Sequence, residues 1–173
     1  MAEQIDDQLD EIDFAVAAYR VGGDWRVEEI TDNFLTDAEA LADGLRRIPG
    51  DRGAIGLVGV AEDFFLLLRV TPKKLRLVLS DATAVHHWDL ARSAADLIGP
   101  LSMDDDDPWP AGDLELFADL GLTGEELEDL IDDEDAYPDE LVSEIADALG
   151  FGELFDEAVL LDEDEDDGAD EEE

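Results

Sequence analysis

The chain has 173 residues and no cysteine, and its 51 acidic residues outnumber its 10 basic ones, which leaves a net charge of −41. The length suits one domain, or a small domain with an appendage, and the lack of cysteine excludes disulfides, thiolate catalysis and cysteine-based metal centres. So acidic a surface argues against direct binding of nucleic acid or anionic membranes, because phosphate contacts require lysine and arginine.

The chain opens with an acidic arm and a predicted β-hairpin. Residues 1–12 are polar and acidic, and we expect this N-terminal arm to be frayed or disordered. Strands are predicted at 14–20 and 25–30, where aromatic and β-branched residues recur. Gly22 and Gly23 lie between them, and glycine accepts the positive φ that a tight hairpin turn requires.

A helix is predicted after this hairpin. Thr36 is a suitable N-cap, and Glu39 three residues later completes a capping box. The helix should end before Pro49 and Gly50. Its apolar stripe has helical spacing and consists of Ala38, Leu41, Ala42, Leu45 and Ile48.

The strongest β-forming sequence lies between Ala54 and Asp81 and predicts three antiparallel strands, at 54–60, 64–70 and 74–80. The second of these is apolar on both faces, so it should be central in the sheet. The third alternates, which is typical of a strand with one buried face. One face carries Leu75, Leu77 and Leu79, and the other carries Lys74, Arg76, Val78 and Ser80.

A second helix is predicted from Asp89 and should end at Gly99 and Pro100. The first hundred residues therefore run ββαβββα. Hairpin-joined strands with two helices predict an α+β domain at residues 13–99, in which the helices cover one face of a five-stranded antiparallel sheet. This order resembles that of profilin-like and roadblock domains, which often serve as interaction modules.

The charge of the chain changes abruptly after this domain. Residues 1–92 hold 18 acidic and 10 basic residues, whereas residues 93–173 hold 33 acidic residues and no basic one. A break this sharp predicts two segments with different roles. Residues 100–112 are predicted to be an acidic, proline-containing linker, with Trp109 packed against one of the domains.

The second half is predicted to be helical at residues 113–158 and to end in a disordered acidic tail at 159–173. Thr123 begins one helix, with Glu126 at the capping-box position, and Pro138 suits the first turn of the next. Short helices of this kind bury little surface alone, so they must pack on each other, on the sheet or on another protein.

The motifs that hold metals or phosphates are incomplete. A metal site at His86 and His87 would need Asp81 and Asp89 to converge with them, and adjacent helical residues point about 100° apart. We favour a half-exposed loop instead. The aspartate run before Pro138 places proline where a calcium-binding loop requires glycine. The glycines match no phosphate-binding loop, so we expect no catalytic residues, metal or cofactor.

Long stretches of the sequence resemble one family. They include FAVAAYR at 14–20, RRIPGDRGAIGLVGVAEDFFLLLRV at 46–70, LSDATAVHHWDLARSAADLIG at 79–99 and PAGDLELFADLGLTGEEL at 110–127. These strings are similar to those of the actinobacterial tRNA adenosine deaminase-associated proteins, and the resemblance covers about residues 13–158. It implies a protein partner, a tRNA adenosine deaminase, and no catalytic residues. A zinc deaminase needs a Pro-Cys-x-x-Cys motif, which a chain without cysteine lacks.

We therefore expect a non-catalytic accessory protein that binds a protein partner. It should be cytoplasmic, because the N-terminus lacks a signal peptide and no apolar run reaches the ~20 residues of a membrane span. The alternatives are a domain that binds a small molecule or metal, an enzyme that uses carboxylates, and a structural homodimer. The candidate interaction surface consists of Arg69, Lys73, Lys74, Arg76 and Trp109. For the four basic residues we favour pairing with the acidic helices of the same chain.

Overall fold

The computed structural model describes residues 12–30, 34–35, 37–48, 50–51, 53–60, 64–71, 74–98, 110–133 and 136–159. In chain order the strands are β1 (Ile12–Val21), β2 (Asp24–Glu29), β3 (Ala54–Val60), β4 (Phe64–Val70), β5 (Leu75–Leu79) and β6 (Ala111–Gly112). The α-helices are α2 (Ala38–Arg46), α3 (Asp89–Ile98), α4 (Gly124–Ile131) and α5 (Pro138–Leu149), and the 3-10 helices are η2 (Ala82–His86) and η3 (Leu114–Leu120). Residues 152–159 form a further helix.

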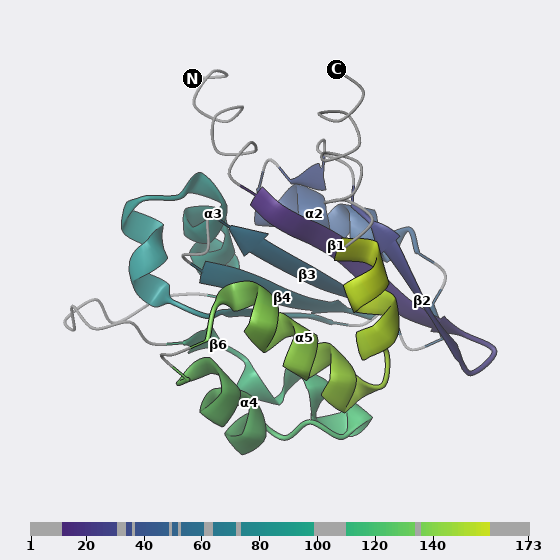
Figure 1. Cartoon of the computed structure of the whole chain (residues 1–173). Coiled ribbons are helices and arrows are strands. Elements are labelled where there is room, and N and C mark those ends of the chain that lie inside the picture. The colour runs from purple at the N-terminus through teal and green to yellow at the C-terminus, as the bar shows by residue number, and fades with distance from the viewer. Residues whose placement is uncertain are drawn as a thin grey trace, which may run out of the picture.

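The strands form one antiparallel sheet in the order β2-β1-β3-β4-β5-β6 (Figure 1). The α+β class and the antiparallel sheet are confirmed, but the predicted count of five strands is wrong, and the 3-10 helix η2 lies between β5 and α3, where the sequence predicts no element. The sixth strand, β6, pairs with Val78 and Leu79 of β5. It has two residues and lies where the sequence predicts a linker, so no alternating pattern marks it.

The centre of the sheet follows directly from the sequence. Every residue of β3 and β4 is buried, and the two strands pair in register around Leu57 and Leu67. The predicted central position of β4 is confirmed. The β1–β2 hairpin turns at Gly22 and Gly23, whose φ angles of 61° and 91° are ones that glycine adopts without steric cost.

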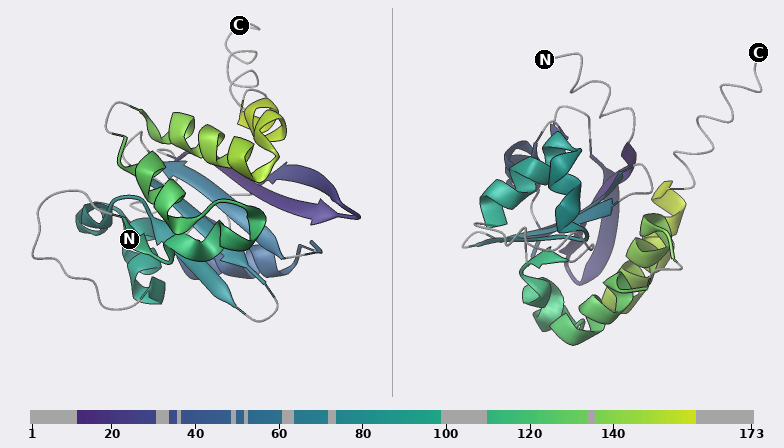
Figure 2. Two further views of the ribbon diagram at one scale, coloured as in Figure 1. Left: turned by 90° about the horizontal axis from the view of Figure 1, so that it is seen from below. Right: turned by 90° about the vertical axis from the view of Figure 1, so that its left-hand side faces the viewer.

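One face of the sheet packs against α2 and α3. Leu41 and Leu45 of α2 and Ala91 and Ala94 of α3 are buried in this layer together with Leu66 and Leu68 of β4. This is the cover that the sequence predicts, in which two helices lie on one face of a sheet of hairpin-joined strands. Figure 2 shows these helices on one side of the sheet in its edge-on view.

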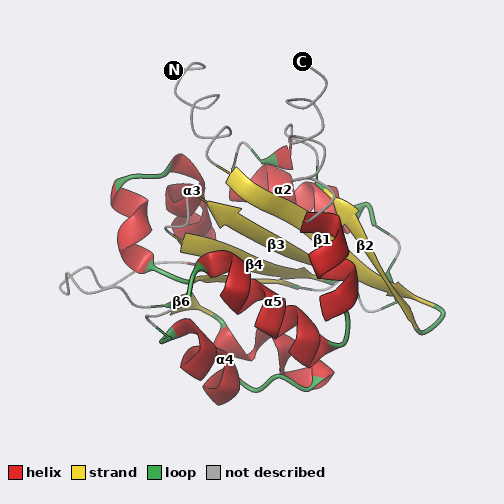
Figure 3. Ribbon diagram, in the orientation of Figure 1, coloured by secondary structure: helices red, strands yellow, loops and turns green. Residues whose placement is uncertain are grey.

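The other face is covered as well, which corrects the prediction of a sheet covered on one face only. Its cover consists of η3, α4, α5 and residues 152–159, hereafter the helical layer (Figures 2 and 3). Phe155 packs edge-on against Phe14 of β1 with ring centroids 5.4 Å apart, and Phe151 lies 4.7 Å from Trp25 of β2. The second half of the chain therefore completes the core rather than forming a separate appendage.

The helix ends of the helical layer match the sequence predictions. Thr123 and Glu126 form a reciprocal capping box at the start of α4, and Pro138 occupies the first turn of α5. Gly150 ends α5 with a φ of 109°. In the other layer the cap of α2 is Asp37, whose Oδ1 accepts a hydrogen bond from the Ala40 amide at 2.7 Å.

Several predictions fall outside the described residues. They are the N-terminal arm at 1–11, the Thr36 cap, the linker at 100–109 with Trp109, Lys73, and the acidic tail from 160 onward. Among the helices of the described residues, none has the length and apolar character needed to cross a membrane.

Candidate functional site

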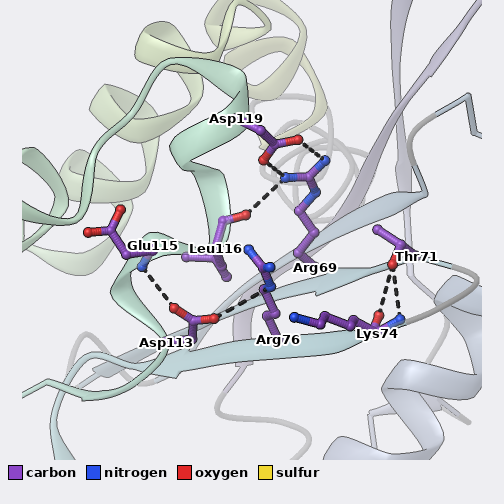
Figure 4. Close-up of polar contacts among 8 residues, drawn as sticks. All are labelled: Arg69, Thr71, Lys74, Arg76, Asp113, Glu115, Leu116 and Asp119. Carbon is purple, nitrogen blue, oxygen red and sulfur yellow. Dashed lines mark hydrogen bonds and ion pairs between the residues drawn. The ribbon is translucent and has the colours of Figure 1, made fainter.

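The predicted basic residues gather at one end of the sheet, beneath η3 (Figure 4). Arg69 lies in β4 directly opposite Arg76 of β5, and Lys74 immediately precedes β5. Together with Thr71 they form the strand side of a cleft of about 450 Å³. Its opposite side is formed by η3, through Glu115, Ala118 and Asp119.

Arg69 is buried and holds η3 against the sheet. It is 5% exposed, in a strand otherwise made of apolar side chains. Its guanidinium makes a bidentate ion pair with Asp119, with Nη2 2.8 Å from Oδ2, and Nη1 also donates to the Leu116 carbonyl at 3.0 Å. Arg69 is therefore a structural contact inside the chain and not part of an exposed interaction surface.

Arg76 also pairs within the chain, but more loosely. Its Nε lies 3.5 Å from Oδ2 of Asp113, and the two side chains are 33% and 44% exposed. The other oxygen of Asp113 accepts a hydrogen bond from the Glu115 amide at 3.1 Å and so caps η3. Both arginines thus bind carboxylates of the second half of the chain, as the sequence predicts.

Lys74 differs from these arginines. Its backbone closes a turn with Thr71, whose Oγ1 accepts from the Lys74 amide at 3.0 Å and whose amide donates to the Lys74 carbonyl at 2.8 Å. The Lys74 side chain is exposed and makes no ion pair among the described residues. Of the predicted surface, Lys74 and Arg76 face solvent, and Lys73 and Trp109 lie outside the described part of the chain.

The two histidines are not brought together with carboxylates. The rings of His86 and His87 are 6.4 Å apart between centroids, at the end of η2. Asp81 instead caps η2 through the Thr83 amide at 2.9 Å, and Asp89 pairs with Arg92 at 3.0 Å. Within the described ranges, no group of three or more His, Asp and Glu side chains is placed to hold a metal ion.

A second feature is the outer surface of the helical layer. In α5 the apolar residues Leu141, Val142, Ile145 and Leu149 are buried, whereas the acidic residues all face solvent. These acidic residues are Asp139, Glu140, Glu144 and Asp147. None of these four side chains makes an ion pair among the described residues, and no basic residue follows Arg92 in the sequence, so the outward side of α5 carries net negative charge.

Near this acidic surface lies an exposed aromatic side chain. Tyr137, which precedes α5, is 56% exposed, unusually high for a large apolar side chain in this protein. Aromatic rings of this kind commonly anchor protein interfaces and can stack on arginine or lysine of a partner. Sequence reasoning missed Tyr137, because a tyrosine before a helix carries no signal of its exposure.

Comparison with known proteins identifies a family and a relative that match most of the chain. The family model described as Rv3753c-like tRNA adenosine deaminase-associated protein matches residues 13–152. Protein Rv3753c of Mycobacterium tuberculosis (strain ATCC 25618 / H37Rv) is 36% identical over 150 residues, which cover 84% of this chain and 87% of that protein. No solved structure matches the chain. The matched residues take in the sheet and helices from both covering layers.

Proposed function

The chain belongs to the family of Rv3753c-like tRNA adenosine deaminase-associated proteins, and on this premise we propose that it is a non-catalytic accessory protein that binds a tRNA adenosine deaminase. The family description supports the association. The acidic surface of the helical layer supports electrostatic binding between the two proteins. The absence of cysteine supports a non-catalytic role, because zinc-dependent nucleobase deaminases hold their metal with cysteine and histidine.

The observation that carries the proposal is the acidic outer surface of α4 and α5 in the helical layer. The outward side chains of α5 include Glu140, Glu144 and Asp147, and neighbouring α4 adds Glu125, Glu128 and Asp129. An enzyme that acts on tRNA must present lysine and arginine to the phosphates of its substrate. An acidic layer is complementary to such a surface, and opposite charges speed the encounter of the two proteins.

Binding of the acidic surface to the tRNA-binding surface would affect the binding of tRNA itself. A partner that docks through acidic side chains on a tRNA-binding surface occupies the place of the tRNA phosphates. The accessory protein and tRNA would then compete for the deaminase. We propose that the helical layer acts in this way, as a phosphate mimic that regulates access of tRNA or stabilises the free enzyme.

The test uses the complete chain and the tRNA adenosine deaminase encoded in the same genome. Truncation after α3 would expose Phe65 and Leu67, which the helical layer buries, so a shortened chain cannot serve as a control. We expect the purified proteins to form a complex that tRNA displaces, measured by calorimetry with and without tRNA. No complex between the two wild-type proteins would refute the proposal.

Matched charge variants locate the binding surface. The triple variant Glu140→Gln, Glu144→Gln, Asp147→Asn removes three charges from α5 and should weaken binding by about tenfold or more, at roughly 0.5 kcal/mol per lost contact or higher. The control Glu39→Gln, Asp43→Asn, Asp96→Asn removes the same charge from exposed positions of α2 and α3 on the opposite layer. Equal weakening by both variants would show that net charge, and not the helical layer, drives association.

A further inference from the structure

We infer that the cleft between β4, β5 and η3 binds the single anionic group of a small organic molecule, a carboxylate or a phosphate, and that Lys74 and Arg76 receive it. The cleft is lined from one side by the strand residues and from the other by η3 (Figure 4). The inference concerns a surface other than the outer side of α5, and it does not depend on the deaminase.

The carboxylates around the cleft are already engaged. Both oxygens of Asp119 bind Arg69, and the two oxygens of Asp113 receive the Glu115 amide and Arg76. Glu115 accepts the Gly124 amide at 3.4 Å, at the first residue of α4. These contacts balance Arg69 and part of the charge of Arg76. They leave the charge of Lys74 without a partner in the described structure.

The three basic residues of the cleft differ in how many hydrogen-bond donors remain for a ligand. Arg69 uses both of its terminal nitrogens within the chain. Arg76 contacts Asp113 through its Nε, and its side chain is 33% exposed. Its terminal Nη groups can therefore donate to a ligand. Lys74 adds an ammonium group with three donors. An arginine fork beside an ammonium group suits a carboxylate or phosphate, because charge-assisted bonds to such groups are among the strongest in proteins.

The size and charge of the cleft narrow the ligand class. Its volume of about 450 Å³ is in the range of small-molecule sites and exceeds what an inorganic ion fills. Ala118 gives η3 an apolar contact for the organic part of the ligand. Glu115 and Asp119 lie opposite the cations, within a protein of net charge −41, and they repel polyanions. A molecule with one anionic group therefore fits better than a nucleic acid strand.

The test is an NMR titration of the complete chain with phenyl phosphate and with benzoate, which share a ring and differ in the anion. Benzamide is the neutral control. We expect at least one of the two anions to shift the backbone amides of Lys74 and Arg76 in a saturable way, and benzamide not to. The relative affinity of phenyl phosphate and benzoate decides whether phosphate or carboxylate is preferred.

Substitutions then assign the site. Lys74→Gln should weaken binding of the preferred anion by about tenfold, the loss expected for one charge-assisted hydrogen bond. Arg92→Gln, which removes an exposed arginine of α3, should leave binding unchanged. Lys74 is exposed and its side chain has no ion pair among the described residues, so its replacement should not disturb folding, which thermal unfolding verifies.

Three outcomes would overturn the inference. The anions fail to shift these amides at concentrations of about 10 mM, where millimolar affinity is still detected. Alternatively, benzamide produces the same shifts as benzoate, or Lys74→Gln leaves the affinity unchanged. Arg76→Gln alone cannot decide the matter, because Arg76 also contacts Asp113 at the cap of η3.

Discussion

Arg69 stands out at the scale of single residues, because it is a charged side chain in a strand that is otherwise apolar. A buried guanidinium is tolerated when it is paired and hydrogen-bonded, and here Asp119 and the Leu116 carbonyl accept hydrogen bonds from its two terminal nitrogens. Its partner Asp119 is half exposed, with 51% of its side chain accessible. The pair therefore attaches η3 to β4 at the boundary between the core and the solvent.

Loss of the carboxylate that pairs with the buried Arg69 should destabilise the fold more than replacement of Arg69 by an apolar side chain. Asp119→Ala leaves Arg69 buried and unpaired, and we expect it to lower the free energy of unfolding by about 2 kcal/mol. Arg69→Met replaces the guanidinium by an unbranched apolar side chain, which leaves no buried charge, and should lower the free energy of unfolding less. Asp43→Ala breaks an exposed pair with Arg46 and should change it by less than about 0.5 kcal/mol. Urea unfolding of the variants gives the order, and equal losses for Asp119→Ala and Asp43→Ala would contradict it.

Tyr19 links stability to pH. Its hydroxyl donates to Oε1 of Glu28 at 2.7 Å. This hydrogen bond raises the pKa of Tyr19 above its ordinary value of 10.0, and burial of the side chain contributes a smaller increase. The folded protein thus holds the phenolic proton more tightly than the unfolded chain does. The stabilisation is complete below pH 10.0 and is lost as the pH rises through the raised pKa.

Tyr19→Phe measures this contribution. At about pH 8 the variant should be less stable than the wild type by about 1 kcal/mol, the usual worth of one hydrogen bond, and the difference should shrink above pH 10. Tyr137→Phe is the matched control, because Tyr137 is 56% exposed, and its effect should be small at both pH values. A difference for Tyr19→Phe that is constant up to about pH 11 would argue that packing, not the proton, is responsible.

At the scale of elements, β3 is shaped by its two glycines, one on each face of the sheet. A Cβ at Gly59 would lie 2.3 Å from Cε1 of Phe14, whose ring packs against Phe155. A Cβ at Gly56 would lie 2.9 Å from Cδ1 of Leu45, the mobile end of a flexible side chain. The first glycine therefore makes room for an aromatic ring that joins the sheet to the helical layer.

Alanine substitutions should separate the two glycines. Gly59→Ala must displace the Phe14 ring and should lower the free energy of unfolding by about 2 kcal/mol, which is typical of overpacking in a core. Gly56→Ala meets a side chain that can rotate away and should cost less than about 1 kcal/mol. Thermal unfolding of both variants checks the order, and a larger loss for Gly56→Ala would show that the α2 layer is the less adaptable one.

The elements also show where sequence reasoning succeeds. The bounds of β3 and β4 are as predicted, because long apolar runs end at polar turns. The capping box of Thr123 and Glu126 is confirmed, because it depends on contacts within one turn of helix. At α2 the N-cap is Asp37, next to the predicted Thr36, and the local signal does not choose between them because both are suitable residue types.

The sequence leaves open whether the C-terminal helices pack on each other, on the second sheet face or on another protein, because that choice depends on packing between distant segments. A signal was nevertheless present in β3 and β4, which are apolar on both faces. A face with Leu57, Phe65 and Leu67 cannot remain open to water, so a second layer was required. The sequence likewise predicts that the basic cluster pairs with the acidic half, but Asp113 and Asp119 are two of 33 acids there, and only the fold selects them.

At the scale of the whole molecule, charge opposes the compact state. Residues 93–173 carry 33 of the 51 acidic residues and no basic one, so the helical layer contains no cation of its own. Salt screens the repulsion between these acidic residues, with a Debye length of about 10 Å at 0.1 M. The ion pairs of Arg69 and Arg76 oppose it locally, and burial protects the first of them from screening.

Stability should therefore rise with ionic strength. Increasing NaCl from about 20 mM to about 500 mM should raise the Tm by several degrees, because self-repulsion is reduced. KCl at the same ionic strength should have the same effect, which separates screening from specific ion binding. A Tm that falls with either salt would show that attractive pairs such as Arg76–Asp113 outweigh the repulsion.

The helical layer comes last in the described chain, so during synthesis it emerges after the sheet that it covers. When residues up to Ile98 have left the ribosome, strands β1 to β5 can pair and pack on α2 and α3, but Phe65 and Leu67 still lack their cover. At synthesis rates of about 5–20 residues per second, the residues up to 159 follow about 3–12 s later. During that interval the nascent chain presents an apolar sheet face to the cell, and a chaperone would find its binding site there.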